Sequence, residues 1–588
     1  MRDLLAHRGP DGAGLWREGA VLLGHRRLAV VDTTPAGAQP MVSADGAIAL
    51  VYNGELYNDA ALRATIRRVD PRPFSSACDT ETVLRAIEVW GDAAPARLRG
   101  MFALAWWDTR RERLTLARDP LGVKPIYYAQ VDGEVIFASE PGPILAHPHV
   151  SPAPNLAMVS AYLTTIRTVL GADTLFEGVS AVEPGTTARF DLSEDSIDAH
   201  TERFWRGVSA DELEEGAAAR TRDAVEQSVR AHLRADVPVC ALLSGGLDST
   251  ITTSVAKDHI SGLRTYVAGA PGGTDEDDLA SAARVAAELG VAHERALLCR
   301  ESFRERWPEL VRAHGTPLST PNEVAIHAVA ERLRADGCVV TISGEGADEL
   351  FAGYEAPMLA AWRYSRLDPA GAAGGRFQLE MNSWVPLGAK ALVLRPQIVS
   401  AVGRDEALID LYQDWFAEAA REAGPLADPV EAHLRLLQRV NLTGLLQRLD
   451  SATMRAGVEG RTPFADVRIA ELAQSLPISI KFDPGQLGED DLGESGVAVS
   501  TRVRTKIALR DAFRGRIPAE ALDRPKASFP LPFEQWIGDH ADSLRHSPFA
   551  QAVFTDEVIE TVAASPAEHW RLAWPMMNLA MWGDVWWG

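Results

Sequence analysis

The chain has 588 residues and a mass of 63.6 kDa, which exceeds what one hydrophobic core supports, so we expect two or more domains. Apolar residues make up 46% and charged residues 24%, as in ordinary globular proteins. The net charge of −22 excludes a general nucleic-acid binder, because such a protein needs a concentrated basic face. No apolar run approaches the ~20 residues of a membrane span. No secretory signal is recognisable either, so we expect a cytoplasmic protein with no membrane partner.

The first 200 residues are predicted to form a β-rich layer, because short alternating apolar segments are separated by turns. The predicted strands cover residues 21–28, 48–52, 113–118, 126–129 and 135–139, and a helix is predicted over 81–90. The polar segment 191–206 has no strong periodicity. We therefore assign residues 1–200 and 201–588 to two domains.

Beyond Trp205, long helices alternate with apolar strands, which predicts a parallel sheet with helices on both faces. Helices are predicted over 210–235 and 280–289, strands over 263–267 and 338–342, a helical insertion over 391–449, and surface loops over 368–375 and 485–500. The tryptophans near the C-terminus have partly helical spacing, which favours core or interface packing. They are Trp570, Trp574, Trp582, Trp586 and Trp587.

The cysteine spacing predicts reduced thiols. Cys78, Cys240, Cys299 and Cys338 form no CxxC pair. Few and unpaired cysteines are typical of a reducing compartment.

The stretch Ser244-Gly-Gly-Leu-Asp-Ser249 has the pattern of a phosphate-binding turn between a predicted strand, 237–243, and the predicted start of a helix, 250–256. Glycines let backbone N–H groups approach phosphate oxygens, and the helix dipole favours the negative charge. Asp248 needs a cation between itself and a phosphate, so the spacing predicts Mg²⁺-nucleotide. An ordinary strand-to-helix turn is the alternative for this stretch taken alone.

A second turn of this type, Ser343-Gly-Glu-Gly-Ala-Asp-Glu349, follows the predicted strand 338–342. Two strand ends of a parallel sheet that deliver small residues and acids to one edge create a crevice, the usual ligand position in an open α/β sheet. Asp248 and Asp348 are then placed to share Mg²⁺ on a leaving pyrophosphate.

The sequence SGGLDS resembles the signature of the PP-loop ATP pyrophosphatases, which cleave ATP between the α and β phosphates. Together with SGEGADELFAGY, residues 450–466 and residues 506–510, it resembles the synthetase domain of class B, glutamine-dependent asparagine synthetases. In that family the acceptor carboxylate attacks the α-phosphate of ATP, and ammonia opens the resulting acyl-adenylate to an amide. The resemblance implies an AMP-forming carbon–nitrogen ligase that uses ATP and Mg²⁺, and we expect a homodimer.

The resemblance also implies residue roles. Lys506 neutralises charge during adenylation, and Glu345 receives the proton from the attacking ammonia. β-Lactam synthetases carry a tyrosine at the position of Glu345, so the glutamate favours intermolecular amidation. Glu349 and Tyr354 are expected to shape the acceptor side, whereas Arg461 either reaches the acceptor pocket or forms a structural ion pair. The implied ATP-binding residues are Leu243, Ser244, Gly245, Gly246, Asp248, Ser249, Ala268, Ser343 and Gly344, and the implied metal ligands are Asp248 and Asp348.

The first half resembles the class II glutamine amidotransferase domain in residues 7–12, 24–32, 52–55, 79–81, 100–108 and 118–128. By that resemblance Arg27 holds the glutamine carboxylate, and Glu55 and Asp79 hold its amino group. Asn53 and the Gly54 backbone stabilise the oxyanion. The implied fold is an α+β, N-terminal-nucleophile-hydrolase-like β-sandwich followed by an α/β PP-loop ATP pyrophosphatase domain with helical insertions.

The N-terminal sequence departs from the amidotransferase pattern. Those enzymes use a cysteine at position 2, whose thiol and free α-amine act together. This sequence begins Met1-Arg2-Asp3, and its first cysteine is the internal Cys78. Either translation starts at an earlier Met-Cys, which the intact glutamine-site residues favour, or the nucleophile is lost. As written, the chain is expected to use free ammonia or ammonia from a partner.

Aspartate is the expected acceptor by family frequency, which predicts asparagine, AMP and pyrophosphate as products and glutamine or ammonia as the nitrogen source. Some asparagine synthetases carry an arginine near the segment 317–322, whereas this chain has no basic residue there. Amidation of a different carboxylate in natural-product biosynthesis is therefore an alternative. A catalytically silent scaffold that binds glutamine or nucleotide is the alternative from another class of protein. The presence of Asp248, Glu345, Asp348 and Lys506 argues against it.

Overall fold

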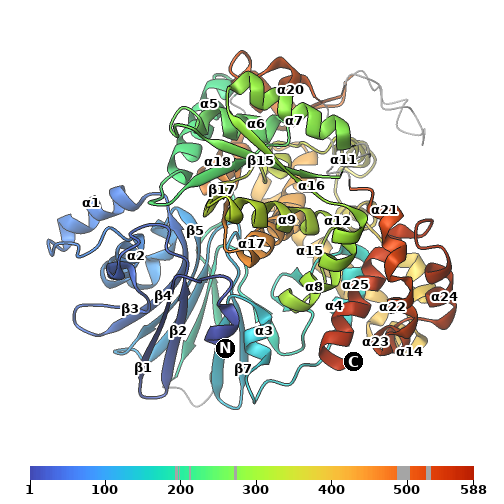
Figure 1. Cartoon of the computed structure of the whole chain (residues 1–588), viewed down its shortest axis with the longest axis horizontal. Coiled ribbons are helices and arrows are strands. Elements are labelled where there is room, and N and C mark those ends of the chain that lie inside the picture. Colours follow the sequence, from blue (N-terminus) through green and yellow to red (C-terminus); the bar gives the residue numbers. More distant parts are fainter. Residues whose placement is uncertain (193–196, 198, 211–213, 271–274, 486–502, 525–530) are drawn as a thin grey trace.

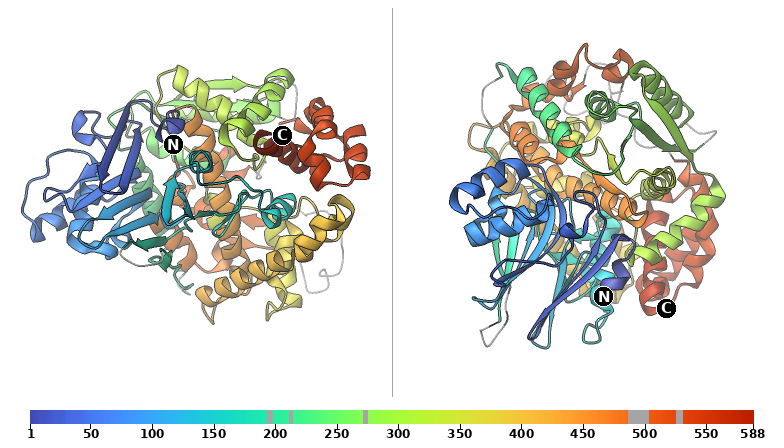
Figure 2. Two further views of the ribbon diagram at one scale, coloured as in Figure 1. Left: turned by 90° about the horizontal axis from the view of Figure 1, so that it is seen from below. Right: turned by 60° about the vertical axis from the view of Figure 1, so that its left-hand side comes forward.

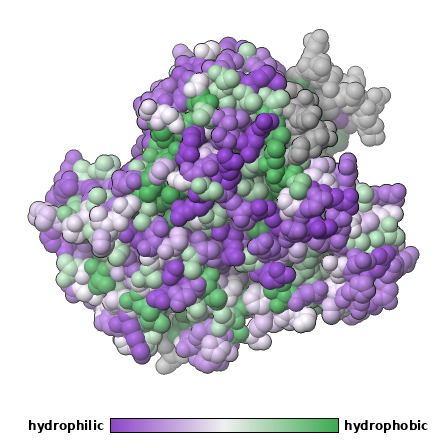
Figure 3. Space-filling view, viewed as in Figure 1, coloured by the Kyte–Doolittle hydropathy of each residue, from purple (hydrophilic) through white to green (hydrophobic). Residues whose placement is uncertain are grey.

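The structure is a computed structural model of the whole chain, and it describes all residues except 193–196, 198, 211–213, 271–274, 486–502 and 525–530 (Figure 1). In that view the strand-rich first half, blue to teal, lies at the lower left, with the parallel sheet of the second half above it and the C-terminal helices at the right. No helix in the described ranges is long and apolar enough to cross a membrane. The face in Figure 3 is mainly hydrophilic, with hydrophobic residues in small separate patches.

The first half contains two antiparallel sheets and a separate hairpin. The sheets have the strand orders β13-β12-β6-β5-β4-β3 and β8-β7-β11-β10-β9, and the hairpin pairs β1 with β2. The strands are β1 Gly12–Glu18, β2 Val21–Arg27, β3 Met41–Val42, β4 Ile48–Leu56, β5 Gly100–Asp108, β6 Arg113–Arg118, β7 Tyr127–Val131, β8 Glu134–Ala138, β9 Val169–Leu170, β10 Asp173–Thr174, β11 Val179–Ala181, β12 Thr186–Asp191 and β13 His200–Arg203.

The six-stranded sheet is covered on both faces, which explains the nearly continuous apolar sequences of β4 and β5. On one face, Val83 and Ile87 of α2 (Asp79–Trp90) pack with Phe102 and Trp106 of β5. On the other face, the sheet shares a cluster with β7 and β8, so the two sheets form a β-sandwich. The predicted sandwich is confirmed.

An all-parallel sheet of order β16-β15-β14-β17-β18 forms the centre of the second half. Its strands are β14 Val239–Leu242, β15 Arg264–Gly269, β16 Ala292–Leu297, β17 Val340–Ile342 and β18 Glu459–Arg461. Helices lie on both sides of this sheet (Figure 1). They include α5 Ala217–His232, α6 Leu247–Ala256, α7 Asp275–Leu289, α8 Arg300–His314, α9 Asn322–Ala335 and α18 Val467–Ser475. This arrangement confirms the α/β prediction, because parallel sheets need cover on both faces.

The helical insertion is also confirmed. It contains α14 Pro396–Ala401, α15 Glu406–Ala423, α16 Val430–Leu437, a π-helical turn at Gln438–Leu442 and α17 Thr443–Arg455. The tryptophan-rich end forms α25 (Trp570–Trp587), where Trp574 and Trp582 are fully buried, as the packing interpretation predicts. In the left view of Figure 2, the C-terminal helices, in red, lie at the end of the molecule opposite the blue N-terminal part that contains α2.

Some predicted boundaries differ from the structure. Strand β4 continues to Leu56 because its last residues still pair with β5. Helix α5 begins only at Ala217, after Gly216, whose backbone is left-handed. The predicted loop 368–375 ends early, since α12 (Gly374–Met381) begins inside it. Of the predicted loop 485–500, all but Gly485 lies outside the described residues.

Cys240 and Cys338 form a disulfide, so the prediction of reduced thiols is wrong for this pair. The two cysteines lie on and beside the neighbouring strands β14 and β17, which brings their Cα atoms to 6.2 Å. Sequence spacing did not reveal the pair because 98 residues separate the two positions. Cys78 and Cys299 are free.

Candidate active site

The two predicted phosphate-binding turns lie side by side at one edge of the parallel sheet. Strand β14 leads into Ser244–Gly246 and then α6, and the neighbouring β17 leads into the second turn and α10 (Ala347–Leu350). A Cβ atom at Gly344 would lie 2.8 Å from the backbone nitrogen of Ser249, so this approach requires glycine. The structure therefore brings the two turns together at the carboxyl ends of β14 and β17, as the sequence predicts.

The residues predicted to bind ATP lie on these turns or on adjacent strands. Leu243 is fully buried, and its N–H donates to the Tyr266 carbonyl at 2.8 Å. The hydroxyls of Ser244 and Ser249 lie 3.1 Å apart. Ala268 is buried in the adjacent strand β15. The Leu243 bond holds the start of the first turn against the sheet, and the two hydroxyls brace the turn itself.

Lys506 joins the two turns. Its Nζ atom lies 2.6 Å from Oδ2 of Asp248 and 2.6 Å from Oδ1 of Asp348, and its side chain is only 4% exposed. Lys506 has a left-handed backbone with φ 51° just before α19 (Ile507–Phe513). A Cβ atom at Gly353 would meet both Asp348 and Lys506 within 2.2 Å, so a glycine is required beside them. One ammonium thus lies between the two acids that the sequence assigned to a metal.

Glu345 has a partner that sequence reasoning missed. Arg448 of α17 donates from Nη2 to Oε1 of Glu345 at 2.9 Å and from Nη1 to the Thr320 hydroxyl at 2.9 Å. Thr320 belongs to the segment that the sequence linked with the acceptor. The only sequence signal was that Arg448 lies two residues before the matched stretch 450–466. The structure therefore places an arginine between the candidate base and the acceptor segment.

Glu349 and Tyr354 lie beside this group. The Tyr354 hydroxyl donates to Oε1 of Glu349. Burial raises the pKa of Glu349 to about 7, and the charge of Asp348 adds to this increase. Acids that repel one another in a buried site favour the binding of a cation between them.

The acceptor segment is held by the tryptophan helix α25. Trp574 Nε1 donates to the Ser319 carbonyl at 3.1 Å, and Trp582 Nε1 donates to the Gly315 carbonyl at 3.0 Å. Oδ1 of Asn578 accepts the Leu318 N–H at 3.1 Å. The C-terminal helix thereby fixes the backbone that carries Thr320.

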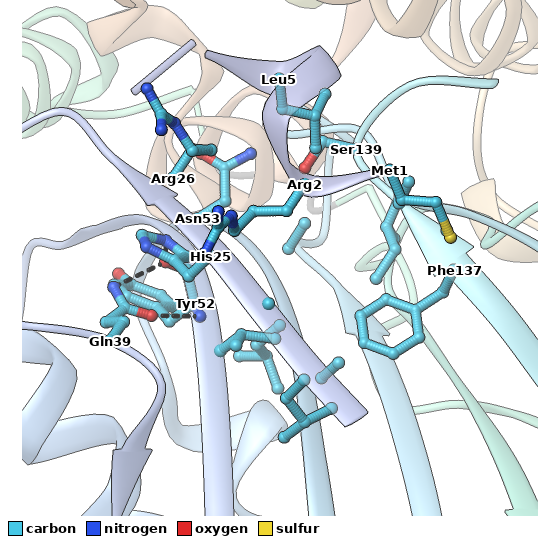
Figure 4. A pocket seen from close by; sticks show the side chains of 18 of the residues that line it. Met1, Arg2, Leu5, His25, Arg26, Gln39, Tyr52, Asn53, Phe137 and Ser139 are labelled. Atoms are coloured by element: carbon cyan, nitrogen blue, oxygen red, sulfur yellow. Dashed lines mark hydrogen bonds between the residues drawn. The ribbon is translucent and has the colours of Figure 1, made fainter. Parts of the chain in front are cut away.

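The second candidate site is a cavity of ≈ 670 Å³ in the first half (Figure 4). All five residues predicted to bind glutamine line it, namely Arg27, Asn53, Gly54, Glu55 and Asp79. The Nδ2 atom of Asn53 is buried and has no hydrogen-bond partner among the described residues. An amide donor in that state fits the predicted role at an oxyanion.

Two buried carboxylates, Glu55 and Asp79, line this cavity. Burial raises the pKa of Glu55 well above its usual range, although Arg461 opposes the shift from 3.2 Å. Burial also raises the pKa of Asp79, whose Oδ2 accepts the Leu56 N–H at 2.9 Å. An ammonium group between the two acids would relieve this penalty.

Arg27 uses part of its guanidinium on the neighbouring loop, where it donates to the carbonyls of Thr34 at 2.8 Å and Val31 at 3.3 Å. Those bonds fix the arginine at the cavity wall.

Arg461 connects the two sites instead of reaching the acceptor pocket. Its guanidinium is fully buried and contacts Glu55 at 3.2 Å and Glu459 at 2.7 Å. Its own carbonyl accepts the N–H of Ser343, the first residue of the second turn, at 2.8 Å. Of the two alternatives from the sequence, the structural ion pair is correct.

Comparison with known proteins identifies a family for each half of the chain. The family described as asparagine synthase matches residues 220–584, and the glutamine amidotransferase domain family matches residues 1–205. The chain belongs to the asparagine synthase family. It is a ligase of the asparagine synthetase type, and ATP-dependent amidation is its reaction class.

Similar proteins include asparagine synthetases and amidases. The glutamine-hydrolysing asparagine synthetase 1 of Bacillus subtilis is 27% identical over 100% of this chain and 93% of the relative. The putative asparagine synthetase of Mycobacterium tuberculosis is 29% identical over 99% of this chain and 92% of the relative. The amidase chry2 of Gibberella zeae is 27% identical over 91% of this chain and 85% of the relative.

Among solved structures, glutamine phosphoribosylpyrophosphate amidotransferase from B. subtilis matches with a TM-score of 0.25 and 15% identity, over 58% of this chain and 77% of that chain.

In this member of the family, the cysteine that lines the cavity is Cys78. It is buried, and burial together with the charge of Asp79 raises the pKa of its thiol to about 11. A thiol with so high a pKa is mostly protonated at neutral pH, so Cys78 is a poor nucleophile.

A buried ion group joins the two halves of this family member. Asp450 of α17 accepts from Arg8 at 2.6 Å and from Lys124 at 2.8 Å, and all three side chains are almost completely buried. Burial would raise the pKa of Asp450, but the two cations outweigh it and lower that pKa. These charges were not recognised in the sequence, because the partners lie more than 300 residues away along the chain.

Proposed function

We propose that this chain converts aspartate to asparagine through an aspartyl-adenylate, with release of AMP and pyrophosphate. The observation that carries the proposal is the position of Lys506 between Asp248 and Asp348, on two adjoining turns that also carry Glu345. Two glycine turns at a sheet edge suit a pyrophosphate, and a buried lysine suits the charge that develops on it.

The two acids fit a magnesium ion. Asp248 and Asp348 already converge on one cation, the Lys506 ammonium, and carboxylate oxygens are the ligands that Mg²⁺ prefers. When bound, Mg²⁺ would neutralise charge on the phosphates. Asp248 and Asp348 would hold it, and Lys506 would then be free to contact phosphate oxygens.

The protein's own residues supply the remaining steps. The acceptor carboxylate oxygen forms a bond to the α-phosphorus while the bond to pyrophosphate breaks. Ammonia then attacks the acyl carbon, and AMP leaves with the electron pair of the broken C–O bond. Glu345 takes the excess proton from nitrogen, and Arg448 at 2.9 Å orients its carboxylate.

The amidotransferase-like cavity is the proposed glutamine site. Glu55 and Asp79 would hold the glutamine ammonium, Arg27 its carboxylate, and Asn53 with Gly54 the oxyanion. The nitrogen comes either from glutamine or from free ammonia, and the raised pKa of Cys78 makes its thiol a poor nucleophile for glutamine hydrolysis.

A different carboxylic acid is the second candidate acceptor. The similarity to the amidase chry2 covers most of both chains at the same identity as one asparagine synthetase. In addition, the only basic contact to the acceptor segment described above comes from Arg448, on another helix. The two-domain division at residue 200, the homodimer and the cytoplasmic location stay predictions.

The deciding measurement is ATP–pyrophosphate exchange with a panel of carboxylic acids. Exchange with aspartate supports asparagine synthesis, whereas exchange with another acid alone identifies that acid as the acceptor substrate. A protein that exchanges with no acid but still binds ATP or glutamine would be a scaffold. Product analysis with ammonia and with glutamine then identifies the nitrogen source.

A further inference from the structure

A second cavity lies at the junction of the two halves and shares no lining residue with the cavity of the first half. Its volume is ≈ 130 Å³, close to the ~150 Å³ of an engineered cavity that binds benzene. Leu170 and Trp205 form part of one wall, and Trp415 and Gln474 form part of the other. One small molecule in this cavity would touch both halves of the chain.

The cavity has a positive lining, although the chain carries a net charge of −22. Five arginines and two glutamates line it, which gives a formal charge of +3; they are Arg118, Arg203, Arg206, Arg435, Arg439, Glu183 and Glu422. Arg203 contacts Glu418 at 2.8 Å, and Arg439 contacts Glu183 at 3.5 Å, so ion pairs join the two halves beside the cavity. A positive lining of this kind favours an anion.

Arg435 indicates where the anion binds. The residue is only 4% exposed, and its Nη2 donates to the Val208 carbonyl at 2.6 Å and the Gln474 carbonyl at 3.2 Å. Its Nε and Nη1 atoms are shielded from solvent and have no hydrogen-bond partner among the described residues. Buried N–H donors of a charged group that lack a hydrogen-bond partner destabilise the folded protein. An oxyanion that accepts hydrogen bonds from them would remove this cost.

The cavity also contacts an unusual turn of the backbone. Its lining includes Gln438, Val440 and Leu442 of the π-helical turn that joins α16 to α17. Such turns are rare and occur frequently at functional sites. Helix α17 then carries Arg448, the partner of Glu345, and Asp450, the partner of the first half. A ligand against this turn can therefore act on the helix that contacts both halves.

We propose that this cavity is a regulatory site for a small dianionic oxyacid, either a short dicarboxylic acid or a phosphate. The oxyanion binds the unmet donors of Arg435, and the ligand alters amidation through the π-helical turn and α17. This site does not depend on which acid is the acceptor.

Calorimetric titration of the full chain with succinate and with inorganic phosphate tests the proposal, and the two probes separate the carboxylate and phosphate sources. Arg435→Gln should weaken binding about 10- to 100-fold, the value of a charge-assisted hydrogen bond. Ala419→Leu, which fills the cavity from α15, should abolish binding while preserving the fold. Arg376→Gln is the matched control, because that arginine is exposed and forms an ion pair with Glu380 of the same helix, α12.

Binding in the presence of saturating ATP, lost in both cavity variants and kept in the control, supports the site. The proposal is wrong if neither probe binds, if ATP displaces the probe, or if Ala419→Leu binds as tightly as the wild type. If Arg435→Gln fails to fold, the Ala419→Leu result decides alone. All these outcomes are read from binding, so they are independent of the ATP–pyrophosphate exchange that tests the proposed reaction.

Discussion

Replacing Lys506 with methionine should slow ATP–pyrophosphate exchange and, at the same time, strengthen Mg²⁺ binding. The side chain keeps its length but loses the ammonium that lies 2.6 Å from both Asp248 and Asp348. At an effective dielectric constant of ~20, each such contact corresponds to about 6 kcal/mol before desolvation. Loss of one preorganised group at a transition state costs about 3–4 kcal/mol, so exchange should fall by about 10²–10³-fold. The acids, however, should bind Mg²⁺ more tightly, because the competing ammonium is gone.

The assay is carboxylate-dependent ATP–pyrophosphate exchange, combined with a Mg²⁺ titration of the same variant. Lys257→Met is the matched control, since Lys257 follows α6 directly and its Nζ donates to the Leu289 carbonyl at 3.0 Å, away from both turns. A Lys506→Met variant that keeps more than about a tenth of the exchange rate would contradict a role of the ammonium in adenylation. Equal losses in both variants, or weaker Mg²⁺ binding in Lys506→Met, would refute it as well.

Three further variants test other parts of the structure. Asp450→Asn should lower the free energy of unfolding by about 3–5 kcal/mol in urea, because Arg8 and Lys124 stay buried without their anion; an unchanged transition would contradict this. Burial lowers the pKa of His433 to about 4, so the native state should lose up to ~3 kcal/mol between pH 6.5 and 4. His433→Gln should flatten that decline, and an identical pH profile would argue against it. Glu345→Gln should keep ATP–pyrophosphate exchange but reduce amide formation about 10²–10⁴-fold. Equal loss of both activities would contradict the role of Glu345 as the general base.

The parts of the fold that follow local patterns could be predicted from the sequence. Strand β6 occupies the predicted residues 113–118, and the strand, turn and helix around Ser244–Ser249 have the predicted order. Their apolar periodicity depends on neighbours along the chain. The pairing of Cys240 with Cys338 depends instead on β14 and β17 being adjacent, which no local pattern reports.

The same limit applies to the sites. The two turns identified the acids, but Arg448 next to Glu345 was missed, because its role depends on where α17 crosses the sheet. Arg461 was recognised as an ion-pair candidate, yet its contact with Glu55 crosses from one half of the chain to the other. Contacts of this kind arise from packing between elements that are distant in sequence, and only the three-dimensional structure gives them.

The edges of β2 and β8 border the amidotransferase-like cavity. Every residue of β2 and of β8 lines it, and in the described part of the chain β2 pairs only with β1 and β8 only with β7. Each strand therefore has one edge without a strand partner beside the cavity. Unpaired edges accept an added strand, and main-chain hydrogen bonds would hold it.

We therefore expect an extended peptide of alternating apolar residues to bind between β2 and β8. A peptide that begins with cysteine should also confer glutamine hydrolysis, because its thiol and free α-amine would enter the cavity that Asn53 and Glu55 line. The matched control begins with serine: it should bind equally and give little hydrolysis. A peptide with prolines at the pairing positions should not bind, since proline lacks the N–H donor. Hydrolysis that is equal with the serine and cysteine peptides would mean that the thiol is not the nucleophile. Equal binding of the proline peptide would mean that the two strand edges do not form the site.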